Sequence, residues 1–220
     1  MIQTMRLDWN TIDTCFLDMD GTLLDLYYDH KVWHVELPRR LASKDNLNKT
    51  EAKLRIELIT EENKGTLSWY DLDFWKRALD IDIDEIEIAL SHYISLRTGA
   101  IEFLLALKQK PLTLFLVTNA HPRGLDRKLE KTLIGNYFDH IISSHEIGLA
   151  KESLGFWKGF HRRYNFNKSR SILIDDNLNV LKTAKEFGIK HTYGVQRPNS
   201  KGEAYSSEDF FLIENYSSLL

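Results

Sequence analysis

The chain has 220 residues, of which 43% are hydrophobic and 28% are charged, and its 29 basic and 32 acidic residues give a net charge of −3. This length fits one large domain, or a domain that carries a smaller insert, with enough apolar residues to build a core. The nearly balanced charge argues against a general binder of nucleic acids or membrane surfaces.

The N-terminal sequence and the cysteine content bear on the compartment. The first ten residues lack the apolar core of a signal peptide, and no stretch of the sequence is apolar over a membrane-spanning length. The single cysteine, Cys15, excludes an internal disulfide and fits a small buried residue in a reducing environment. We therefore expect a cytoplasmic protein with no membrane or nucleic-acid partner.

The first predicted element is an apolar strand at residues 14–17. From residue 28 to residue 96 the sequence then becomes rich in Leu, Glu, Lys and Trp at helical spacing. We predict helices at 49–63, 69–79 and 84–96, with Asp84 as the N-cap of the last one. This helical block separates the first strand from the rest of the chain.

After Gly99, helices and strands alternate. The predicted helices are 100–109, 123–133, 153–164 and 178–187, and the predicted strands are 112–117, 141–142, 171–174 and 190–193. Gly135 and Gly188 are expected to stop the second and fourth of these helices. Such alternation implies an α/β fold, in which helices cover both faces of a parallel sheet. We expect a core domain of residues 1–27 and 97–220, with residues 28–96 inserted as a helical lid.

Two acidic residues, Asp18 and Asp20, follow the first predicted strand directly. Gly21 lets the chain turn there, so both carboxylates can flank one point at the end of the strand. One carboxylate could act as a nucleophile while the other transfers protons, and a hard cation would offset their charge. For an isolated Asp-x-Asp-Gly sequence, an acidic turn without chemistry is the commoner explanation.

Three further polar groups follow later strands and favour the chemical interpretation. They are Thr118 and Asn119 after the second strand, Lys151 in the loop after the third, and Asp175 with Asp176 after the fourth. The carboxyl ends of parallel strands meet at one edge of a sheet, where α/β proteins place their ligands. The sequence therefore predicts one site built from all these residues.

An acid pair, a hydroxyl, a lysine and a second acid pair, in this order, resemble the haloacid dehalogenase (HAD) superfamily, whose members are mostly phosphatases. The resemblance implies a Rossmann-like core with an all-helical type 1 cap, which agrees with the predicted lid. It implies that Asp18 attacks phosphorus to give an aspartyl-phosphate and that Asp20 protonates the leaving group and then activates water. Thr118, the backbone amide of Asn119 and the ammonium group of Lys151 would hold the phosphate.

The same resemblance implies a Mg²⁺ cofactor bound by the Asp18 carboxylate, the Asp20 backbone carbonyl and the second acid pair. Many members have another acid four residues after this pair, where this chain has Val180. We therefore expect Asp176 to bind the metal directly and Asp175 to act through a water molecule.

A second departure from the family pattern follows the lysine. Proline often stands there, whereas this chain has Glu152. We expect this change to affect only the stiffness of the loop.

Residues 13–29, 66–75 and 118–122 resemble one family more narrowly, the bacterial GMP/IMP nucleotidases, which release phosphate from purine 5′-mononucleotides. The resemblance runs from about Asp8 to Arg197 and implies a purine nucleoside monophosphate as substrate. Aromatic residues of the lid, with Tyr28 and Trp69 foremost, could stack on a planar base, although packing could equally explain them.

Other functions stay open at this point. A sugar-phosphate phosphatase or a phosphoglucomutase-like enzyme would share every core residue. A haloacid dehalogenase is disfavoured because Asp20 serves phosphoryl chemistry, and a non-catalytic phosphate-binding or partner-binding module is disfavoured because no essential carboxylate is missing. We expect a monomer or a weak homodimer.

Overall fold

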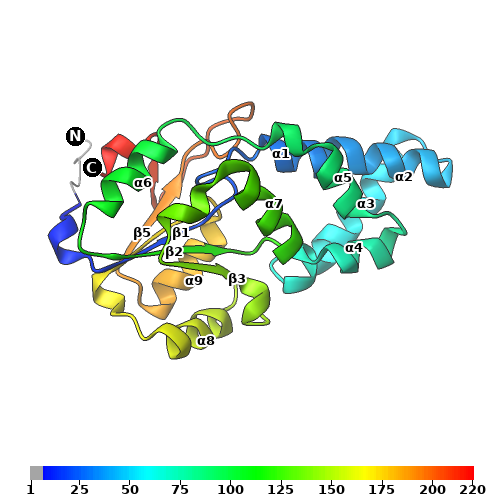
Figure 1. The fold of residues 1–220 in the computed structure, drawn as a ribbon. Helices are drawn as coiled ribbons and strands as arrows, with labels where there is room; N and C mark the ends of the chain where they lie inside the picture. The colour runs from blue at the N-terminus through cyan, green and yellow to red at the C-terminus, as the bar shows by residue number, and fades with distance from the viewer. Residues whose placement is uncertain (1–6) are drawn as a thin grey trace.

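The computed structural model describes residues 7–220, so the first six residues of the predicted segment 1–27 lie outside the described range. A parallel sheet with flanking helices forms one end of the molecule, and a block of helices forms the other (Figure 1). The C-terminus lies at the sheet end, far from the helical block (Figure 1). No helix within residues 7–220 has the length and hydropathy needed to cross a membrane.

The sheet has six parallel strands in the order β3-β2-β1-β4-β5-β6. The strands are β1 Thr14–Leu17, β2 Thr113–Thr118, β3 His140–Ser143, β4 Ser171–Ile174, β5 His191–Val195 and β6 Phe211–Ile213. All four residues of β1 are buried, as expected of a central parallel strand that is covered on both faces. The carboxyl ends of β1, β2 and β4 therefore lie side by side at the middle of the sheet.

Helices cover both faces of the sheet, and each face has its own apolar core. Helices α6 (Ala100–Lys108) and α7 (Pro122–Thr132) lie on one side, and α8 (Leu154–Tyr164) and α9 (Leu178–Phe187) lie on the other (Figure 1). Alternate residues of β1 enter the two cores, because Cys15 packs into the first core and Phe16 into the second. The central strand is thus fixed from both sides.

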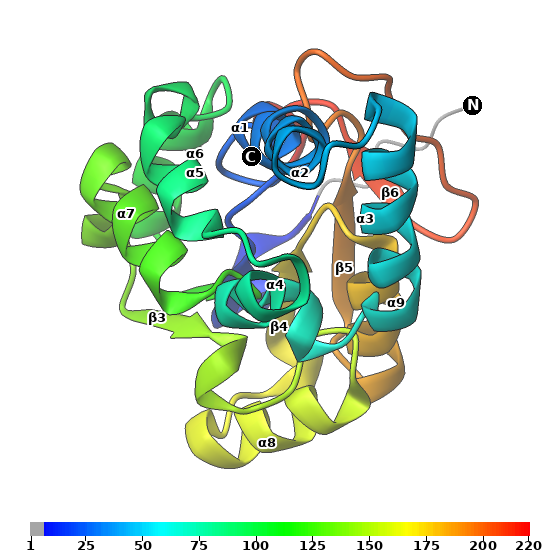
Figure 2. The same ribbon diagram turned by 90° about the vertical axis from the view of Figure 1, so that its right-hand side faces the viewer.

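The helical insert, residues 27–93, lies between β1 and α6 in the chain. Its segments are α1 Tyr27–His30, the π-helical η2 Lys31–Glu36, α2 Leu37–Asp45, α3 Lys49–Asn63, the 3₁₀ turn η3 Leu67–Tyr70, α4 Leu72–Leu79, α5 Ile83–Ala89 and the 3₁₀ turn η4 Ser91–Tyr93. Viewed from the insert, α5 and α3 stand on either side of α4 (Figure 2). The prediction of an α/β core with an inserted all-helical cap is confirmed, while the domain boundaries stay predictions.

Short turns account for most differences from the predicted elements. The helix expected at 69–79 is divided into η3 and α4, because Asp71 caps α4 by accepting a hydrogen bond from Asp73 N at 2.9 Å. The helix expected at 84–96 ends at Ala89, and its N-cap is Asp82 rather than Asp84. Each cap aspartate accepts from a backbone amide two residues later, which is the local contact that sets the helix start.

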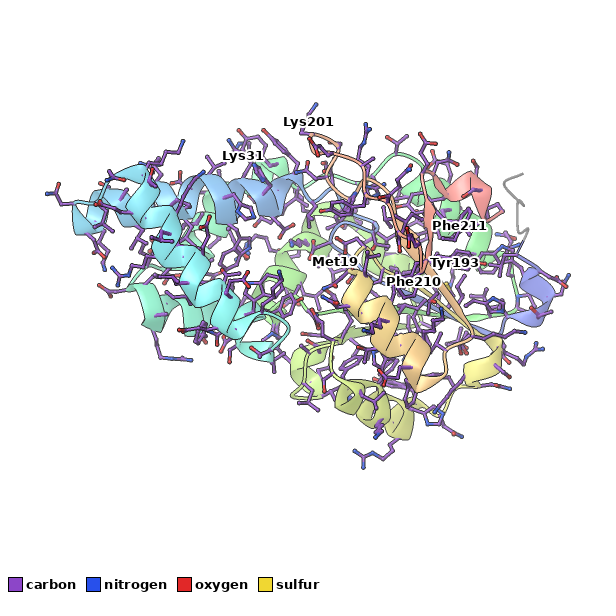
Figure 3. The ribbon with its side chains drawn as sticks, turned by 180° about the vertical axis from the view of Figure 1, so that it is seen from behind. Met19, Lys31, Tyr193, Lys201, Phe210 and Phe211 are labelled. Atoms are coloured by element: carbon purple, nitrogen blue, oxygen red, sulfur yellow. The ribbon has the colours of Figure 1, made fainter. Side chains whose placement is uncertain are left out.

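Three 3₁₀ turns follow strands or helices of the core, and two more stand at the ends of the chain. These turns are η1 Trp9–Thr11, η5 Ile134–Tyr137, η6 Ser144–Glu146, η7 Lys168–Arg170 and η8 Tyr216–Ser218. The edge strand β6 was not predicted because it has only three residues. The rings of Phe211 of β6 and Tyr193 of β5 pack nearly perpendicular to each other, with ring centroids 5.9 Å apart (Figure 3).

Helix α7 ends at Thr132, and its cap is Leu133 rather than the predicted stop residue Gly135, because Leu133 adopts the left-handed conformation with φ 57°. A left-handed non-glycine residue costs about 1–2 kcal/mol, and the Leu133 side chain is 63% exposed, so little packing offsets this cost. We expect Leu133→Gly to raise the free energy of unfolding by about 1 kcal/mol in urea denaturation. Leu105→Gly, at an exposed position inside α6, should lower it by about 1 kcal/mol. A Leu133→Gly variant less stable than the wild type would show that the left-handed conformation of Leu133 does not destabilise the fold.

Candidate active site

The chain turns sharply where β1 ends. Asp18 N donates to Ile174 O at 3.0 Å, which continues the pairing with β4, and Gly21 N then donates to Leu24 O at 2.8 Å. Gly21 has φ 79°, and a Cβ atom on it would lie 2.4 Å from Asp176 Oδ2. Glycine is therefore required both for the turn and for the close approach of the two acidic loops. Met19, inside this turn, lies between the sheet and the helical insert (Figure 3).

Lys151 joins the two acidic loops. Its Nζ atom lies 2.5 Å from Asp18 Oδ1 and 2.7 Å from Asp175 Oδ2, and it also donates to Val117 O at 2.9 Å. The side chain is 2% exposed. Burial alone would lower the pKa of Lys151, but the carboxylates of Asp175 and Asp18 raise it above its usual value. The lysine is thus a fixed cation at the centre of the site.

The carboxyl groups of Asp18, Asp175 and Asp176 crowd together, with ligand oxygens within 4.8 Å of one another. Burial raises the pKa of Asp18 to about 8, the charges of Asp175 and Asp20 act in the same direction, and Lys151 opposes them. Burial also raises the pKa of Asp176 well above its usual range, with further contributions from the Asp18 and Asp175 charges. One lysine does not offset this many buried carboxylates, so the oxygen set fits a hard cation such as Mg²⁺.

The adjacent residues Asp175 and Asp176 differ in the hydrogen bonds that their carboxylate oxygens accept. Asp175 Oδ2 accepts from Lys151, and Asp175 Oδ1 accepts from Asn177 N at 2.9 Å. Within residues 7–220 the Asp176 carboxylate accepts no comparable hydrogen bond and faces the Asp18 loop at Gly21. This difference supports the assignment of Asp176 as the direct metal ligand, which stays a prediction.

Thr118 and Asn119 occupy the end of β2 beside Lys151. Thr118 is 1% exposed, and its Oγ1 accepts from Ala120 N at 3.0 Å, which leaves the hydroxyl hydrogen free to be donated to an anion. Asn119 Oδ1 accepts from Lys151 N at 2.9 Å, so this side chain orders the lysine loop. Both residues line the cavity described below.

The expectation that Glu152 affects only loop stiffness is wrong. Its carboxylate accepts from Tyr70 Oη at 2.6 Å, from Asn119 Nδ2 at 2.9 Å and from Asn177 Nδ2 at 3.0 Å. Burial raises the pKa of Tyr70 well above its usual value, and the Glu152 charge adds to this, so the phenol remains a donor. Glu152 therefore ties η3 of the insert to two loops of the core. A charged residue in place of proline beside the site lysine was the sequence signal for this role.

A cavity of about 470 Å³ lies over these groups, between the carboxyl end of the sheet and the helical insert. Its floor includes Asp18, Asp20 and Lys151. The insert contributes His30, Trp33, His34, Ile56, Thr60, Trp69, Tyr70 and Leu72, and the loop after β5 contributes Asn199, Gly202, Glu203 and Tyr205. The cavity can thus admit an organic group attached to a phosphate that sits on the acidic floor.

Tyr28 is not part of the cavity wall, which contradicts its predicted role in stacking on a substrate. The side chain is 1% exposed, and its hydroxyl donates to Glu87 O at 3.1 Å. Tyr28 thus packs inside the insert, where it joins α1 to α5, whereas Trp69 does line the cavity.

Lys128 of α7 is a site residue that the sequence did not reveal. Its Nζ lies 2.7 Å from Asp20 Oδ1 and 2.9 Å from Asp29 Oδ1, and its side chain is 4% exposed. Burial would lower the pKa of Lys128, but Asp20, Asp29 and Glu87 raise it, so the group is a cation. Its position on the buried face of α7, beside Gly124 and Leu125, was the available signal.

Comparisons with known proteins agree with this geometry. The chain is 35% identical over 196 residues to the GMP/IMP nucleotidase YrfG of Escherichia coli K12, which covers 89% of this chain and 88% of that protein. It is 24% identical to a phosphorylated carbohydrates phosphatase of Thermotoga maritima, over 88% of this chain and 89% of that one. A HAD phosphatase structure from Thermococcus onnurineus superposes with a TM-score of 0.75 at 19% identity, covering 94% and 95% of the two chains. The haloacid dehalogenase-like hydrolase family model matches residues 12–188, and the chain belongs to this family.

Proposed function

We propose that this hydrolase is a Mg²⁺-dependent phosphatase that acts through an aspartyl-phosphate, with purine nucleoside 5′-monophosphates such as GMP and IMP as substrates. The observation that carries the proposal is the buried group of Asp18, Lys151 and the acid pair 175–176 beneath a cavity walled by aromatic side chains. Phosphoryl transfer requires that a protein position the reacting groups and offset charge, and this group can do both.

Asp18 is the proposed nucleophile. Lys151 holds Oδ1 of its carboxylate, which leaves the other oxygen to form a bond to phosphorus as the ester bond breaks. Lys151 and the Thr118 hydroxyl would bind phosphate oxygens, and their positive charge and donated hydrogen bond stabilise the charge of the transition state. Asp18, Asp176 and the Asp20 carbonyl would hold Mg²⁺, with Asp175 acting through a water molecule, and the ion would supply further positive charge when bound.

Asp20 is the proposed proton carrier. It gives a proton to the leaving oxygen in the first step, and in the second it takes a proton from the water that attacks the aspartyl-phosphate. The second step breaks the bond between Asp18 and phosphorus, so both aspartates return to their initial state. The net reaction is hydrolysis of a phosphomonoester to an alcohol and phosphate.

Substrate choice must come from the cavity wall, because the floor recognises only phosphate and metal. Trp69, Trp33 and His30 offer planar rings at that wall, which suits a planar base, and the E. coli relative is a GMP/IMP nucleotidase. A sugar phosphate is the second candidate, because the Thermotoga relative is a carbohydrate-phosphate phosphatase. A cytoplasmic location and a monomer or weak homodimer remain predictions.

Replacement of the nucleophile tests the chemistry. Asp18→Asn should lower kcat by about 10³-fold or more, roughly 4 kcal/mol of barrier, because an amide of similar size cannot attack phosphorus. Release of phosphate from GMP is the measurement, and thermal melting of the variant checks its folding. Substantial turnover by a well-folded Asp18→Asn protein would rule out Asp18 as nucleophile.

Metal removal tests the acidic floor. Activity should vanish with a chelator and return with Mg²⁺ but not with Ca²⁺, whose longer and more numerous bonds would misplace Asp18. Asp176→Ala should raise the Mg²⁺ concentration needed for half-maximal activity by at least about 100-fold, and Asp175→Ala by less. Mg²⁺ activation curves for the two variants show which of the two aspartates is the direct metal ligand. The reverse order would show that Asp175 is the direct ligand.

A substrate panel tests the specificity. Wild-type enzyme should hydrolyse GMP and IMP with higher kcat/KM than ribose 5-phosphate or glucose 6-phosphate. Trp69→Ala should lower the ratio of kcat/KM for the nucleotides to kcat/KM for the sugar phosphates by about ten- to a hundredfold, since stacking on a base contributes about 1–3 kcal/mol.

Tyr28→Phe is the matched control for Trp69→Ala. It alters an aromatic residue of the insert that is outside the cavity wall, so it should leave the ratio of nucleotide to sugar-phosphate hydrolysis unchanged. A wild-type preference for sugar phosphates across the panel would overturn the nucleotidase assignment and leave the phosphatase assignment intact.

A further inference from the structure

Helix α7 of the core faces α5 of the insert (Figure 1). Three basic side chains of α7 pair with acids of the insert. The pairs are Arg123 with Asp73 at 2.6 Å, Arg127 with Asp84 and Glu87, and Lys128 with Asp29 at 2.9 Å. Arg123 is substantially exposed, so its pair adds little to stability. The buried contacts lie nearer the cavity.

Lys128 differs from its neighbour Arg127 in one respect. Within residues 7–220, Arg127 forms ion pairs with acids of the insert alone, whereas Lys128 also pairs with Asp20 of the core at 2.7 Å. The ammonium group thus bridges a carboxylate of α1 and the carboxylate beside the nucleophile. It also lies 5.1 Å from the ring centroid of Tyr28, which packs under it from the insert.

We infer that Lys128 is a positioning residue that holds Asp20 for proton transfer and couples Asp20, through Asp29, to the helical insert. This inference rests on the proposed phosphatase chemistry. Because Lys128 holds Asp20 Oδ1, the other carboxylate oxygen is the one directed at the leaving group. As the bond between phosphorus and the ester oxygen breaks, that oxygen takes the proton of Asp20, and the carboxylate that remains is paired with the ammonium group.

The coupling follows from where the two acids stand. Lys128 and Asp20 belong to the core, whereas Asp29 belongs to α1 of the insert, so a displaced insert would remove one of the two carboxylates that fix the position of the Lys128 ammonium group. Lys128 donates to Asp29 Oδ1, whereas Asp29 Oδ2 is buried and has no hydrogen-bond partner among residues 7–220. Lys128 is therefore the contact that offsets the burial of this carboxylate. Proton transfer is then favoured only when the insert covers the substrate.

The test compares two esters that differ in their need for a proton. GMP releases an alkoxide, which must be protonated, while p-nitrophenyl phosphate releases a stable phenolate, which need not be. Lys128→Met should lower kcat/KM for GMP by about 100-fold and for p-nitrophenyl phosphate by less than about threefold. The quantity kcat/KM is used because it reports the steps up to cleavage of the ester bond and not the later hydrolysis.

Arg127→Met is the matched control, because it removes ion pairs between α7 and the insert without touching Asp20. Arg127→Met should change kcat/KM for the two esters by the same factor. Asp29→Asn should lower the ratio of kcat/KM for GMP to kcat/KM for p-nitrophenyl phosphate, as Lys128→Met does, by about tenfold. The double variant Lys128→Met/Asp29→Asn, which leaves no unbalanced buried carboxylate pair, should lose no more than Lys128→Met alone.

Three results would overturn the inference. They are equal losses on both esters in Lys128→Met, a ratio change of the same size in Arg127→Met, and additive losses in the double variant. If the wild-type enzyme hydrolyses GMP and any of these results is found, the inference fails and the proposed function stands. A wild-type enzyme that cleaves neither ester overturns both.

Discussion

The ammonium group of Lys151 is the interaction on which the site depends. It sits between the carboxylates that follow β1 and β4, at 2.5 Å from Asp18 and 2.7 Å from Asp175, and is almost completely buried. Without this cation, at least two carboxylates would face each other in a region of low dielectric constant, and one of them would take up a proton. The lysine therefore opposes protonation of the proposed nucleophile, whose pKa is raised by burial, and the sheet keeps the lysine in place, since Val117 O of β2 accepts from the same group.

The helical insert is held to the core on two sides of the cavity. On one side, Lys128 of α7 contacts Asp29, and on the other, Glu152 contacts Tyr70. Each contact also reaches a residue of the floor, because Lys128 holds Asp20 and Glu152 holds Asn119. The contacts that hold the insert to the core therefore share residues with the contacts that hold the floor of the cavity.

The sequence predicted the parts of the structure that depend on local pattern. The strands β1, β2 and β4 are apolar runs because parallel strands are buried on both faces, and the polar residues that follow them marked the edge where the site lies. The same pattern could not divide the insert into its segments, because the breaks come from single caps such as Asp71 and Asp82.

Side-chain partners far apart in the chain lay beyond sequence reasoning. Lys128 and Asp20 are separated by 108 positions, and Tyr70 and Glu152 by 82, so neither pair has a spacing that could have indicated it. The prediction that Tyr28 contacts the substrate was wrong for a different reason. An aromatic residue near the acidic motif suggested a substrate contact, whereas its ring points into the insert and is buried there.

The proposed mechanism requires that Asp18 carry the phosphoryl group during turnover, and this group can be trapped chemically. Enzyme that is hydrolysing GMP in the presence of Mg²⁺ would be quenched rapidly in acid, digested, and mapped by mass spectrometry. We expect one phosphoryl group on the peptide that contains Asp18, at Asp18 itself, and its loss on treatment with hydroxylamine, as expected of an acyl phosphate. Phosphate found on a different side chain, or no phosphorylated peptide in any quench during active turnover, would exclude Asp18 as the nucleophile.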